Sequence, residues 1–425
     1  MEIIMNLAKL NEKFKGCECG KEHTCPIDYV ILGSGAVNEL PSICEKYDSI
    51  ILVSDTNTYE VCGKIVEALL GDKLEASIVL KPNGDVVIPN EEKIAEIEQK
   101  LTPKTELIIG VGSGVINDLC KQVSFTHDLY YYIVATAPSM DGYASVGSAL
   151  ILEGMKITLN ARPPKAIIGD TDVLKYAPMP MLQAGYGDII GKYSCLNDWK
   201  LAALINGEYF CGEIYDLTLS QAKTVRKFAK KILERDGEAV EALMEALVTV
   251  GVAMSYVDNS RPASGSEHHL SHFFEITGIL NGEEYYPHGI DVMYSAAETA
   301  KIREEILASE PSLRRFDREK WTAEIKRIYS SSADGIIALQ DKLAWYDIDD
   351  SDVIHKKWND MKEVLKEAPT FEENLKMLDE IGLSYDEFVK FYTRQKVNDA
   401  VLYAKDLKDR YSILWLYYKY FKGEN

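Results

Sequence analysis

Short apolar segments alternate with helical patterns in the first part of the chain. The apolar segments are four or five residues long and end in turn residues, at 29–32, 49–53, 77–80, 106–109 and 132–135. Between them, residues 59–70 and 91–101 repeat their apolar positions at the spacing of a helix. Continuous apolar strands that alternate with helices are typical of a parallel sheet covered on both faces. The pattern therefore predicts an α/β domain.

The strand pattern stops near Pro180, and the segments after it show helical periodicity. The helical segments are expected at 181–206, 216–232, 238–256, 291–309, 318–343, 352–366 and 371–420. We predict an N-terminal Rossmann-like domain with a parallel sheet over 1–177, which includes a short cysteine-containing extension at 1–26. An all-helical domain is predicted over 178–425.

Composition and charge exclude several classes of protein. The chain has 425 residues and a formal charge of −20, from 47 lysines and arginines against 67 aspartates and glutamates. A chain this acidic is not expected to bind nucleic acid or an anionic membrane. We find no run of about 18 apolar residues, and residues 1–15 lack the pattern of a signal peptide. Eight cysteines without a secretory signal predict reduced thiols in a cytoplasmic protein.

Two glycine-rich turns are candidates for binding the phosphates of a dinucleotide. Residues 33–35 (Gly-Ser-Gly) follow a predicted strand, and Asp55 lies about 20 residues later at a strand end, but Asn38 occupies the third glycine position. Residues 110–118 (Gly-Val-Gly-Ser-Gly-Val-Ile-Asn-Asp) also follow a strand and open a helix, whose N-terminus favours a phosphate. The alternative for either segment is a plain strand-to-helix turn.

Three of the seven histidines lie close together, at His268, His269 and His272, and a fourth follows at His288. On a helix His268 and His272 share one face, while His269 points about 100° away. Imidazoles on one helix, a third from a nearby loop and one carboxylate make a set that binds Zn, Ni, Co or Fe. The alternative is a group of hydrogen-bonded polar residues at a helix start, with His269 exposed to solvent.

Asp188 is the candidate for the missing carboxylate. It lies in the segment 185–192 (Gly-Tyr-Gly-Asp-Ile-Ile-Gly-Lys), whose small glycines leave room for a ligand. Asp188 and Lys192 share a helix face, so an exposed ion pair between them is the alternative interpretation.

Residues 16–25 contain four potential zinc ligands, at Cys17, Cys19, His23 and Cys25. The Cys-x-Cys spacing is tighter than that of most structural zinc sites. We therefore favour a short hairpin ahead of the first strand, with Gly20 at its turn.

These motifs resemble the sn-glycerol-1-phosphate dehydrogenase family, within the superfamily of iron-containing alcohol dehydrogenases, glycerol dehydrogenase and 3-dehydroquinate synthase. The resemblance spans roughly residues 25–300 and is carried by 112–118, 136–145 (Thr-Ala-Pro-Ser-Met-Asp-Gly-Tyr-Ala-Ser), 184–188, and 261–272 followed by His288-Gly289. It implies a dehydroquinate synthase-like fold with the active site in the cleft between the two domains. It also implies that 112–114 is the phosphate-binding turn and that the turn at Gly33 is a sheet-edge turn.

The resemblance assigns roles to residues of this chain. The metal ligands match Asp188, His268 and His288, which with His272 are the expected catalytic residues. Substrate-binding positions match Asp141, Asp188 and His272. The dinucleotide site matches Asp55, Gly112, Ser113, Gly114, Val115, Ile116, Asn117, Asp118, Thr136, Ser139 and Ser145. Lys192 and Arg261 lie next to these motifs and are candidates for binding a substrate phosphate, with a solvated charge or an ion pair as the alternative for each.

The implied reaction is the reduction of dihydroxyacetone phosphate to sn-glycerol 1-phosphate by NADH or NADPH, as part of phospholipid metabolism. One divalent ion (Zn, Ni or Fe) would polarise the carbonyl oxygen while the nicotinamide delivers a hydride. His272 lies one helical turn from a ligand and is a candidate proton relay. Asp55 is expected to bind the adenosine ribose and to favour NAD over NADP.

Other functions fit parts of the same pattern. A glycerol dehydrogenase would act on unphosphorylated polyols, and a lyase like 3-dehydroquinate synthase would regenerate its NAD in each cycle. The resemblance argues against the lyase, because the synthase group has a glutamate ligand at the position where this chain has Asp188. The motifs Asp141-Gly142 and 266–268 favour the phosphate-specific branch over glycerol dehydrogenase. A binding protein that keeps the fold without turnover is a further alternative.

We expect a small phosphorylated ketone or polyol as substrate and a homodimer as the assembly. The homodimer rests on the resemblance and on the aromatic-rich segment 411–421, which predicts either core or a subunit interface. The charge of −20 opposes the binding of anionic phosphates. The site must therefore be locally positive, through the metal ion, the helix N-terminus after 112–114, and Lys192 or Arg261.

Overall fold

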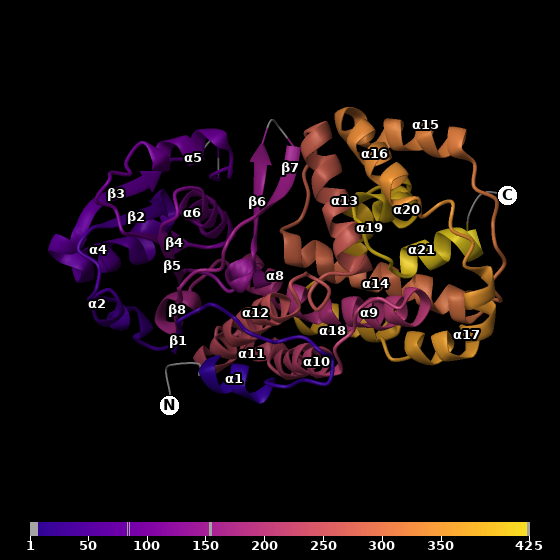
Figure 1. Ribbon diagram of the computed structural model, residues 1–425, viewed down its shortest axis with the longest axis horizontal. Helices are drawn as coiled ribbons and strands as arrows, with labels where there is room; N and C mark the ends of the chain where they lie inside the picture. Colours follow the sequence, from indigo (N-terminus) through magenta and orange to yellow (C-terminus); the bar gives the residue numbers. More distant parts are fainter. Residues whose placement is uncertain (1–6, 83, 85, 153–154, 423–425) are drawn as a thin grey trace. The chain divides into compact units, whose positions relative to one another are not determined.

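The computed structural model describes residues 7–82, 84, 86–152 and 155–422 (Figure 1). The chain divides into two compact units, which we call unit 1 (Met1–Ile189 and Lys223–Asn259) and unit 2 (Ile190–Ala222 and Ser260–Asn425). The predicted division at 177/178 treats the chain as two successive domains. In the structure the chain crosses between the units three times, since the long helix at 237–257 groups with the sheet.

Unit 1 is built on a six-stranded parallel sheet in the order β1-β8-β5-β4-β2-β3. The strands are β1 (Tyr29–Gly33), β2 (Ile50–Asp55), β3 (Leu74–Leu80), β4 (Leu107–Gly112), β5 (Tyr130–Ala135) and β8 (Ala166–Asp170). Five of them correspond to the predicted apolar runs. The sixth, β8, is not among the predicted strands and pairs with both β1 and β5. β1 is therefore an edge strand, which confirms the expected sheet-edge turn at Gly33.

Helices follow these strands along the chain and pack around the sheet (Figure 1). They are α2 (Leu40–Ile43), α3 (Thr56–Thr58), α4 (Lys64–Leu70), α5 (Glu91–Glu98), α6 (Gly114–Thr126), α7 (Thr171–Leu174) and α8 (Met179–Ile190). A hairpin of β6 (Gly147–Leu152) and β7 (Met155–Asn160) interrupts this order and is also absent from the predicted elements. On one face of the sheet, Leu52 and Ile109 of the strands belong to the same buried cluster as Leu40, Val66 and Leu70 of α2 and α4. The continuous apolar runs are thus core strands, as the pattern predicts.

The helix α12 (Gly237–Val257) belongs to the core of unit 1. Of the described helices it is the one long and apolar enough to cross a membrane by length and composition, and 83% of its most apolar stretch is buried in the fold. It packs against β1, α7 and the short helix η4 (Asp141–Ala144). A Cβ atom on Gly251 would lie 2.8 Å from the carbonyl oxygen of Asp141, so a glycine is needed for this close approach. The apolar composition of α12 is accounted for by this packing.

The described residues of unit 2 form helices joined by loops and contain no strands, as predicted. Its helices include α9 (Lys192–Asn206), α13 (Ser266–Asn281), α14 (His288–Leu307), α15 (Arg318–Tyr329), α16 (Ala333–Leu343), α17 (Ser351–Leu365), α18 (Phe371–Glu380), α19 (Tyr385–Phe391), α20 (Arg394–Tyr403) and α21 (Ile413–Tyr417). α13 packs most extensively against α14, and α9, α15 and α20 also pack against α13. The pair α13 and α14 carries the histidines singled out by the sequence.

The aromatic segment at 411–421 is core of unit 2. Trp415 is fully buried and packs against Trp345 and Tyr346, with ring centroids 5.3 and 4.9 Å apart. Leu414 and Leu416 are also fully buried. Of the two interpretations of this segment, the structure supports core, and the segment no longer argues for a subunit interface.

Candidate active site

The turn between β4 and α6 is built for close approach of a ligand to the backbone. Ser113 is the N-cap residue of α6, in an extended conformation with φ −105° and ψ −150°. A Cβ atom on Gly112 would lie 2.5 Å from Cγ1 of Ile116, so a larger residue would clash. The first N–H groups of a helix have no acceptors within the helix and attract anions. This geometry fits the phosphate-binding role predicted for 112–114.

Asp55 lies beside this turn, at the carboxyl end of the neighbouring strand. β2 and β4 are adjacent and parallel, with Ser54 in register with Val111. Oδ1 of Asp55 accepts hydrogen bonds from the backbone N–H groups of Asn57 and Thr58, at 2.8 and 2.9 Å. Its carboxylate therefore caps α3 at the same sheet edge as Gly112, which is the position that the ribose-binding prediction requires.

The buried face of α6 holds the segment 141–149 in place. Nζ of Lys121 donates to the carbonyl oxygens of Gly142 and Gly147, at 2.8 and 3.0 Å, and to Oγ of Ser145 at 3.1 Å. Lys121 is fully buried, and its burial lowers the pKa of its ammonium group. This lysine is not among the residues predicted for the site. A lysine on the apolar face of a helix is the signal that could have identified it.

The predicted dinucleotide residues Asn117 and Asp118 share this network. Asn117 is fully buried and accepts a hydrogen bond from the hydroxyl group of Tyr131 at 2.7 Å. Oδ2 of Asp118 accepts from the backbone N–H of Ala149 at 3.1 Å, and burial raises the pKa of this carboxyl group. The side chains of both residues therefore contact neighbouring strands (Tyr131 and Ala149), whereas Ser113 lies in the turn itself.

The predicted residues of the segment 136–145 follow β5, the strand next to β4. The backbone N–H of Thr136 donates to the carbonyl oxygen of Gly112 at 3.1 Å, which extends the sheet to the turn. The backbone N–H of Ser139 donates to the carbonyl oxygen of Ala137 at 3.0 Å. Ser145 is held by Lys121, as described above. The structure therefore brings Thr136 to the edge where Gly112 ends its strand.

Asp188 and Asp141 are joined by a hydrogen bond within unit 1. Asp188 is fully buried on α8, and its Oδ2 accepts from the backbone N–H of Asp141 at 2.9 Å. A Cβ atom on Gly185 would lie 1.8 Å from the carbonyl oxygen of Pro138, so α8 can approach this loop only where it carries a glycine. This contact explains the glycine of the Gly-Tyr-Gly-Asp segment and places a buried carboxylate beside Asp141.

The histidines His268, His272 and His288 form a cluster in unit 2. His268 and His272 lie one turn apart on α13, and His288 is the first residue of α14. The ring centroid of His288 lies 5.2 Å from that of His268 and 5.2 Å from that of His272. One ring nitrogen of His268 lies within 4.8 Å of one ring nitrogen of His288. The predicted shared face of His268 and His272 is confirmed.

Two of these imidazoles are oriented through their Nδ1 atoms. Nδ1 of His268 lies 2.6 Å from Oε1 of the buried Glu267, and Nδ1 of His288 lies 3.2 Å from Oγ of Ser271. Metal-binding histidines characteristically use one ring nitrogen for such a partner and the other for the ion. Nε2 of each ring is then the nitrogen that could bind an ion, and two imidazoles are suited to Zn, Ni or Fe.

Glu275 is a further acidic residue at this cluster. Ligand atoms of His272, Glu275 and His288 lie within 4.8 Å of one another, and Nδ1 of His272 is 3.7 Å from Oε2 of Glu275. Glu275 is not among the predicted site residues, although its spacing of three residues from His272 places both on one helix face.

His269 is fully buried, unlike in the alternative interpretation that exposes it to solvent. Burial lowers the pKa of its imidazole well below the usual value, and the nearby charge of Arg410 acts in the same direction. The difference arises because α13 packs against other helices on more than one side, including α9, α14 and α20.

Asp198 anchors the start of α13. It is fully buried on α9, where Oδ2 accepts from the backbone N–H of Ser266 at 2.7 Å and Oδ1 accepts from that of Ile413 at 2.9 Å. Arg303 of α14 lies 3.6 Å from Oδ1. Asp198 is not among the predicted site residues, because its partners are distant in the sequence.

The two candidates for phosphate binding have different surroundings. Lys192 is fully buried, and its Nζ donates to the carbonyl oxygen of Ala263 at 2.9 Å. Arg261 is also buried and forms a bidentate ion pair with the carboxylate of Glu208. Its Nη1 donates to the carbonyl oxygen of Tyr411 at 2.8 Å. Arg261 therefore forms an ion pair, which is the alternative to phosphate binding given for it above. We retain Lys192 as the candidate for binding a substrate phosphate.

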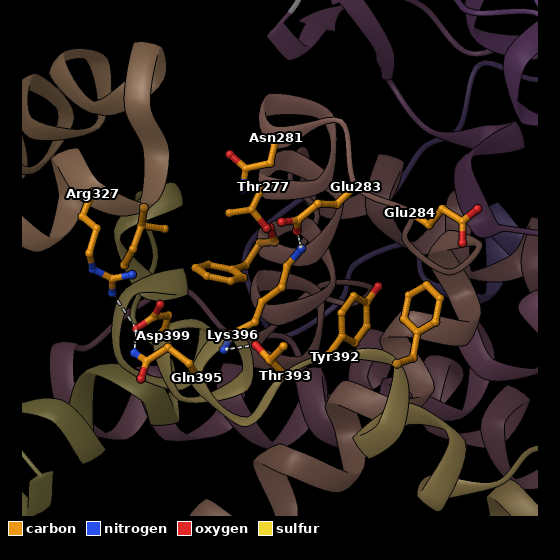
Figure 2. A pocket seen from close by; sticks show the side chains of 13 residues that line it. Thr277, Asn281, Glu283, Glu284, Arg327, Tyr392, Thr393, Gln395, Lys396 and Asp399 are labelled. Atoms are coloured by element: carbon orange, nitrogen blue, oxygen red, sulfur yellow. Dashed lines mark hydrogen bonds and ion pairs between the residues drawn. The ribbon is translucent and has the colours of Figure 1, made fainter.

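A separate pocket of about 510 Å³ lies at the C-terminal half of α13 (Figure 2). Figure 2 shows two ion pairs in it: Lys396 lies 2.6 Å from Glu283, and Arg327 lies 2.8 Å from Asp399. The described residues that line it include no predicted site residue. We therefore do not assign the candidate active site to this pocket.

Comparison with known proteins shows what the chain is similar to. Residues 31–178 match the family model described as iron-containing alcohol dehydrogenase. A protein of Halalkalibacterium halodurans named glycerol-1-phosphate dehydrogenase [NAD(P)+] is 34% identical over 285 residues, which cover 66% of this chain and 71% of that protein. A protein of Pyrococcus furiosus with the same name is 35% identical over 62% of this chain and 79% of its own length.

Solved structures show the same fold at lower identity. A probable glycerol dehydrogenase from Sinorhizobium meliloti superposes with a TM-score of 0.59 at 13% identity, covering 88% of each chain. A sulfoacetaldehyde reductase from Bifidobacterium kashiwanohense in complex with NAD+ superposes with a TM-score of 0.57 at 16% identity, covering 90% of this chain and 91% of that one.

Proposed function

This chain belongs to the glycerol-1-phosphate dehydrogenase family, and from that membership we propose that it reduces dihydroxyacetone phosphate to sn-glycerol 1-phosphate with NADH or NADPH. The observation that carries the proposal is the imidazole pair of His268 and His288, each oriented through Nδ1 by its own partner. A plain cluster of polar residues does not need two rings oriented in this way. A metal site does, because each ring must present one nitrogen to the ion.

We propose Asp188, His268 and His288 as the ligands of one divalent ion. Asp188 is a buried carboxylate near the end of α8, and four residues later the chain has begun α9 of unit 2. The set of one carboxylate and two imidazoles is suited to Zn, Ni or Fe. When bound, the ion supplies positive charge for the substrate carbonyl oxygen, and NAD(P)H supplies the hydride.

The dinucleotide is proposed to bind at the edge formed by the carboxyl ends of β2 and β4. The backbone N–H groups that follow Ser113 would hold the diphosphate, because the N-terminus of α6 attracts negative charge. The free lone pairs of the Asp55 carboxylate would accept hydrogen bonds from the adenosine ribose hydroxyls. Beside this edge, Lys121 of α6 holds the segment 142–147 through hydrogen bonds to its backbone carbonyl groups.

His272 and Lys192 are proposed to act on the substrate. The ring of His272 stacks on that of His288 at an angle of 27°, so His272 lies beside a proposed metal ligand, where its imidazole could donate a proton to the substrate. Lys192 contributes a buried ammonium group, one N–H of which is directed at Ala263. Its positive charge would attract the substrate phosphate locally, although the chain as a whole carries a net negative charge. Asp141 is proposed as a further substrate contact through its side chain.

We also propose that the enzyme works in the cytoplasm as a homodimer. Its eight free cysteines suit a reducing compartment, and the dimer rests on the family resemblance alone.

The experiment that tests the function is the oxidation of NADH with dihydroxyacetone phosphate, compared with dihydroxyacetone, on protein loaded with Zn, Ni or Fe in separate samples. We expect turnover of dihydroxyacetone phosphate to exceed that of dihydroxyacetone by at least about tenfold, since a charged hydrogen bond to phosphate contributes about 1.5–3 kcal/mol.

A further inference from the structure

The segment 16–25 folds into a tight turn that brings three potential metal ligands together. Gly16 and Gly20 both adopt left-handed conformations, with φ of +74° and +82°, which favour glycine. The backbone N–H of Gly20 donates to the carbonyl oxygen of Cys17 at 3.2 Å and closes the turn. The described residues around this turn form no paired strands, so the hairpin that sequence analysis favoured is absent.

Cys17, Cys19 and His23 have ligand atoms within 4.8 Å of one another. Sγ of Cys19 lies 3.2 Å from Nε2 of His23. In a tetrahedral zinc site with Zn–S of about 2.3 Å and Zn–N of about 2.0 Å, neighbouring ligand atoms lie roughly 3.5–4 Å apart. The three side chains therefore need only small rotations to surround one ion.

The orientation of His23 is fixed through its other ring nitrogen. Nδ1 of His23 lies 2.9 Å from the carbonyl oxygen of Tyr256, and the side chain is only 2% exposed. A carbonyl oxygen can only accept, so Nδ1 carries the proton and Nε2 carries the lone pair that faces Cys19. Metal-binding histidines use this arrangement, in which a backbone carbonyl holds the ring while the second nitrogen binds the ion.

The segment is attached to the C-terminal end of α12. Besides the contact of His23 with Tyr256, Nζ of Lys21 donates to the carbonyl oxygen of Val257 at 3.0 Å. The last carbonyl groups of a helix have no donors within the helix, so these contacts satisfy them. The ring of Phe14 packs edge-on against His23, with centroids 6.1 Å apart. The cluster is therefore formed on a rigid base.

We propose that Cys17, Cys19 and His23 bind a zinc ion, distinct from the catalytic metal, that fixes residues 16–25 on the end of α12. Two thiolates and one imidazole form a soft donor set that selects Zn over Mg or Ca. A tetrahedral zinc ion takes four donors, so the proposed ion binds one further ligand besides these three. Cys25 is excluded from the set because it is not part of the cluster, and burial keeps it a thiol by raising its pKa to about 11.

Cobalt substitution distinguishes this site from the catalytic one. A thiolate bound to Co²⁺ gives a charge-transfer absorption in the near ultraviolet, whereas a carboxylate and imidazoles do not. The full-length protein, stripped of metal under reducing conditions and titrated with Co²⁺, should show this absorption with one thiolate-bound ion per chain. The band does not depend on turnover, so failure of the proposed function would leave it unchanged.

Substitutions identify the ligands. The double substitution Cys17→Ser and Cys19→Ser should abolish the band and remove one metal equivalent, while Cys25→Ser should keep both. His23→Ala should weaken Co²⁺ binding at this site at least about tenfold, and His23→Cys should retain the band with greater intensity from a third thiolate. If the double variant does not fold, the single variant His23→Cys still tests the assignment. A wild-type protein without the band, or an undiminished band in the double variant, would overturn the proposal.

Discussion

Nδ1 of His268 lies 2.6 Å from Oε1 of Glu267, and both side chains are buried. Oε1 of Glu267 also accepts the backbone N–H of Gly265 at 2.9 Å, so the carboxylate is itself held in place. Burial acts to raise the pKa of Glu267, but the hydrogen bond and charge of His268 and the N–H of Gly265 outweigh it and lower the pKa. An ionised carboxylate thus orients the ring of a proposed metal ligand.

Glu267→Gln should weaken binding of the catalytic metal by about 10- to 100-fold, because the amide still accepts from Nδ1–H but brings no negative charge. Turnover should recover when the metal is supplied in excess, since the ligands remain. Titration with Zn²⁺, followed by activity at saturating metal, measures both effects. The exposed Glu284→Gln is the matched control. Unchanged metal affinity in the Glu267 variant would show that this carboxylate does not act through the metal site.

Asp55→Ala should reduce the preference for NADH over NADPH, since the ribose loses a hydrogen-bond acceptor and the 2′-phosphate loses a negative neighbour. The substitution also removes the cap of α3, at a cost of about 1 kcal/mol. Thr58→Ala is the control, because it disrupts the same capping box but leaves the carboxylate. Ratios of kcat/KM for the two cofactors should shift in the first variant and stay constant in the second. A shift of equal size in both would assign the effect to the cap.

Lys192→Met should raise KM for dihydroxyacetone phosphate by about 10- to 100-fold, the equivalent of about 1.5–3 kcal/mol for a hydrogen bond to a charged group. KM for dihydroxyacetone should change little. Arg261→Met should instead lower the free energy of unfolding by about 1–3 kcal/mol, because it leaves the buried carbonyl oxygen of Tyr411 without this donor and the partly exposed carboxylate of Glu208 without its ion pair. Steady-state kinetics with both ketones and chemical denaturation separate the two roles. A phosphate-specific KM effect confined to Arg261 would reverse our assignment.

Asp291 gives unit 2 a predictable dependence of stability on pH. Burial raises the pKa of its carboxyl group well above the usual value, although the hydroxyl group of Tyr392, 3.0 Å away, opposes this. Between about pH 4 and the raised pKa, the folded state holds a proton that the unfolded state has released. The free energy of unfolding should therefore fall as pH rises through this interval.

Asp291→Asn cannot ionise and should lack this fall, so its thermal midpoint should exceed that of the wild type by a margin that grows with pH. Thermal unfolding at a series of pH values measures the difference. Parallel curves for the two proteins would mean that Asp291 titrates normally in the folded state.

The sequence predicts the elements whose signals are local. Strands such as β2 and β4 are buried on both faces, so their apolar runs are continuous and easily recognised. β8 consists of only five residues that end in Gly169-Asp170, and it is missed although it lies between β1 and β5. The hairpin β6–β7 is missed because its exposed and buried positions mix, which weakens the apolar run.

The candidate site divides in the same way. The turn at Gly112 and the spacing of His268 and His272 follow from neighbours in the sequence, and the structure places them as expected. Asp198 could not be found in this way, because one of its partners, Ile413, is 215 residues away. Lys121 has partners 21 to 26 residues away, in a loop whose path the sequence does not reveal. Contacts of this kind depend on tertiary packing and not on local pattern.

The most direct test of the central claim is the rate of NADH oxidation by the metal-loaded protein with dihydroxyacetone phosphate, together with the configuration of the product. We predict rapid, metal-dependent oxidation that is at least about tenfold slower with dihydroxyacetone. The product should be refractory to an enzyme that oxidises only sn-glycerol 3-phosphate, and His268→Ala should abolish both metal binding and turnover. Equal rates with the two ketones, a product of the 3-phosphate configuration, or full turnover by His268→Ala would contradict this account.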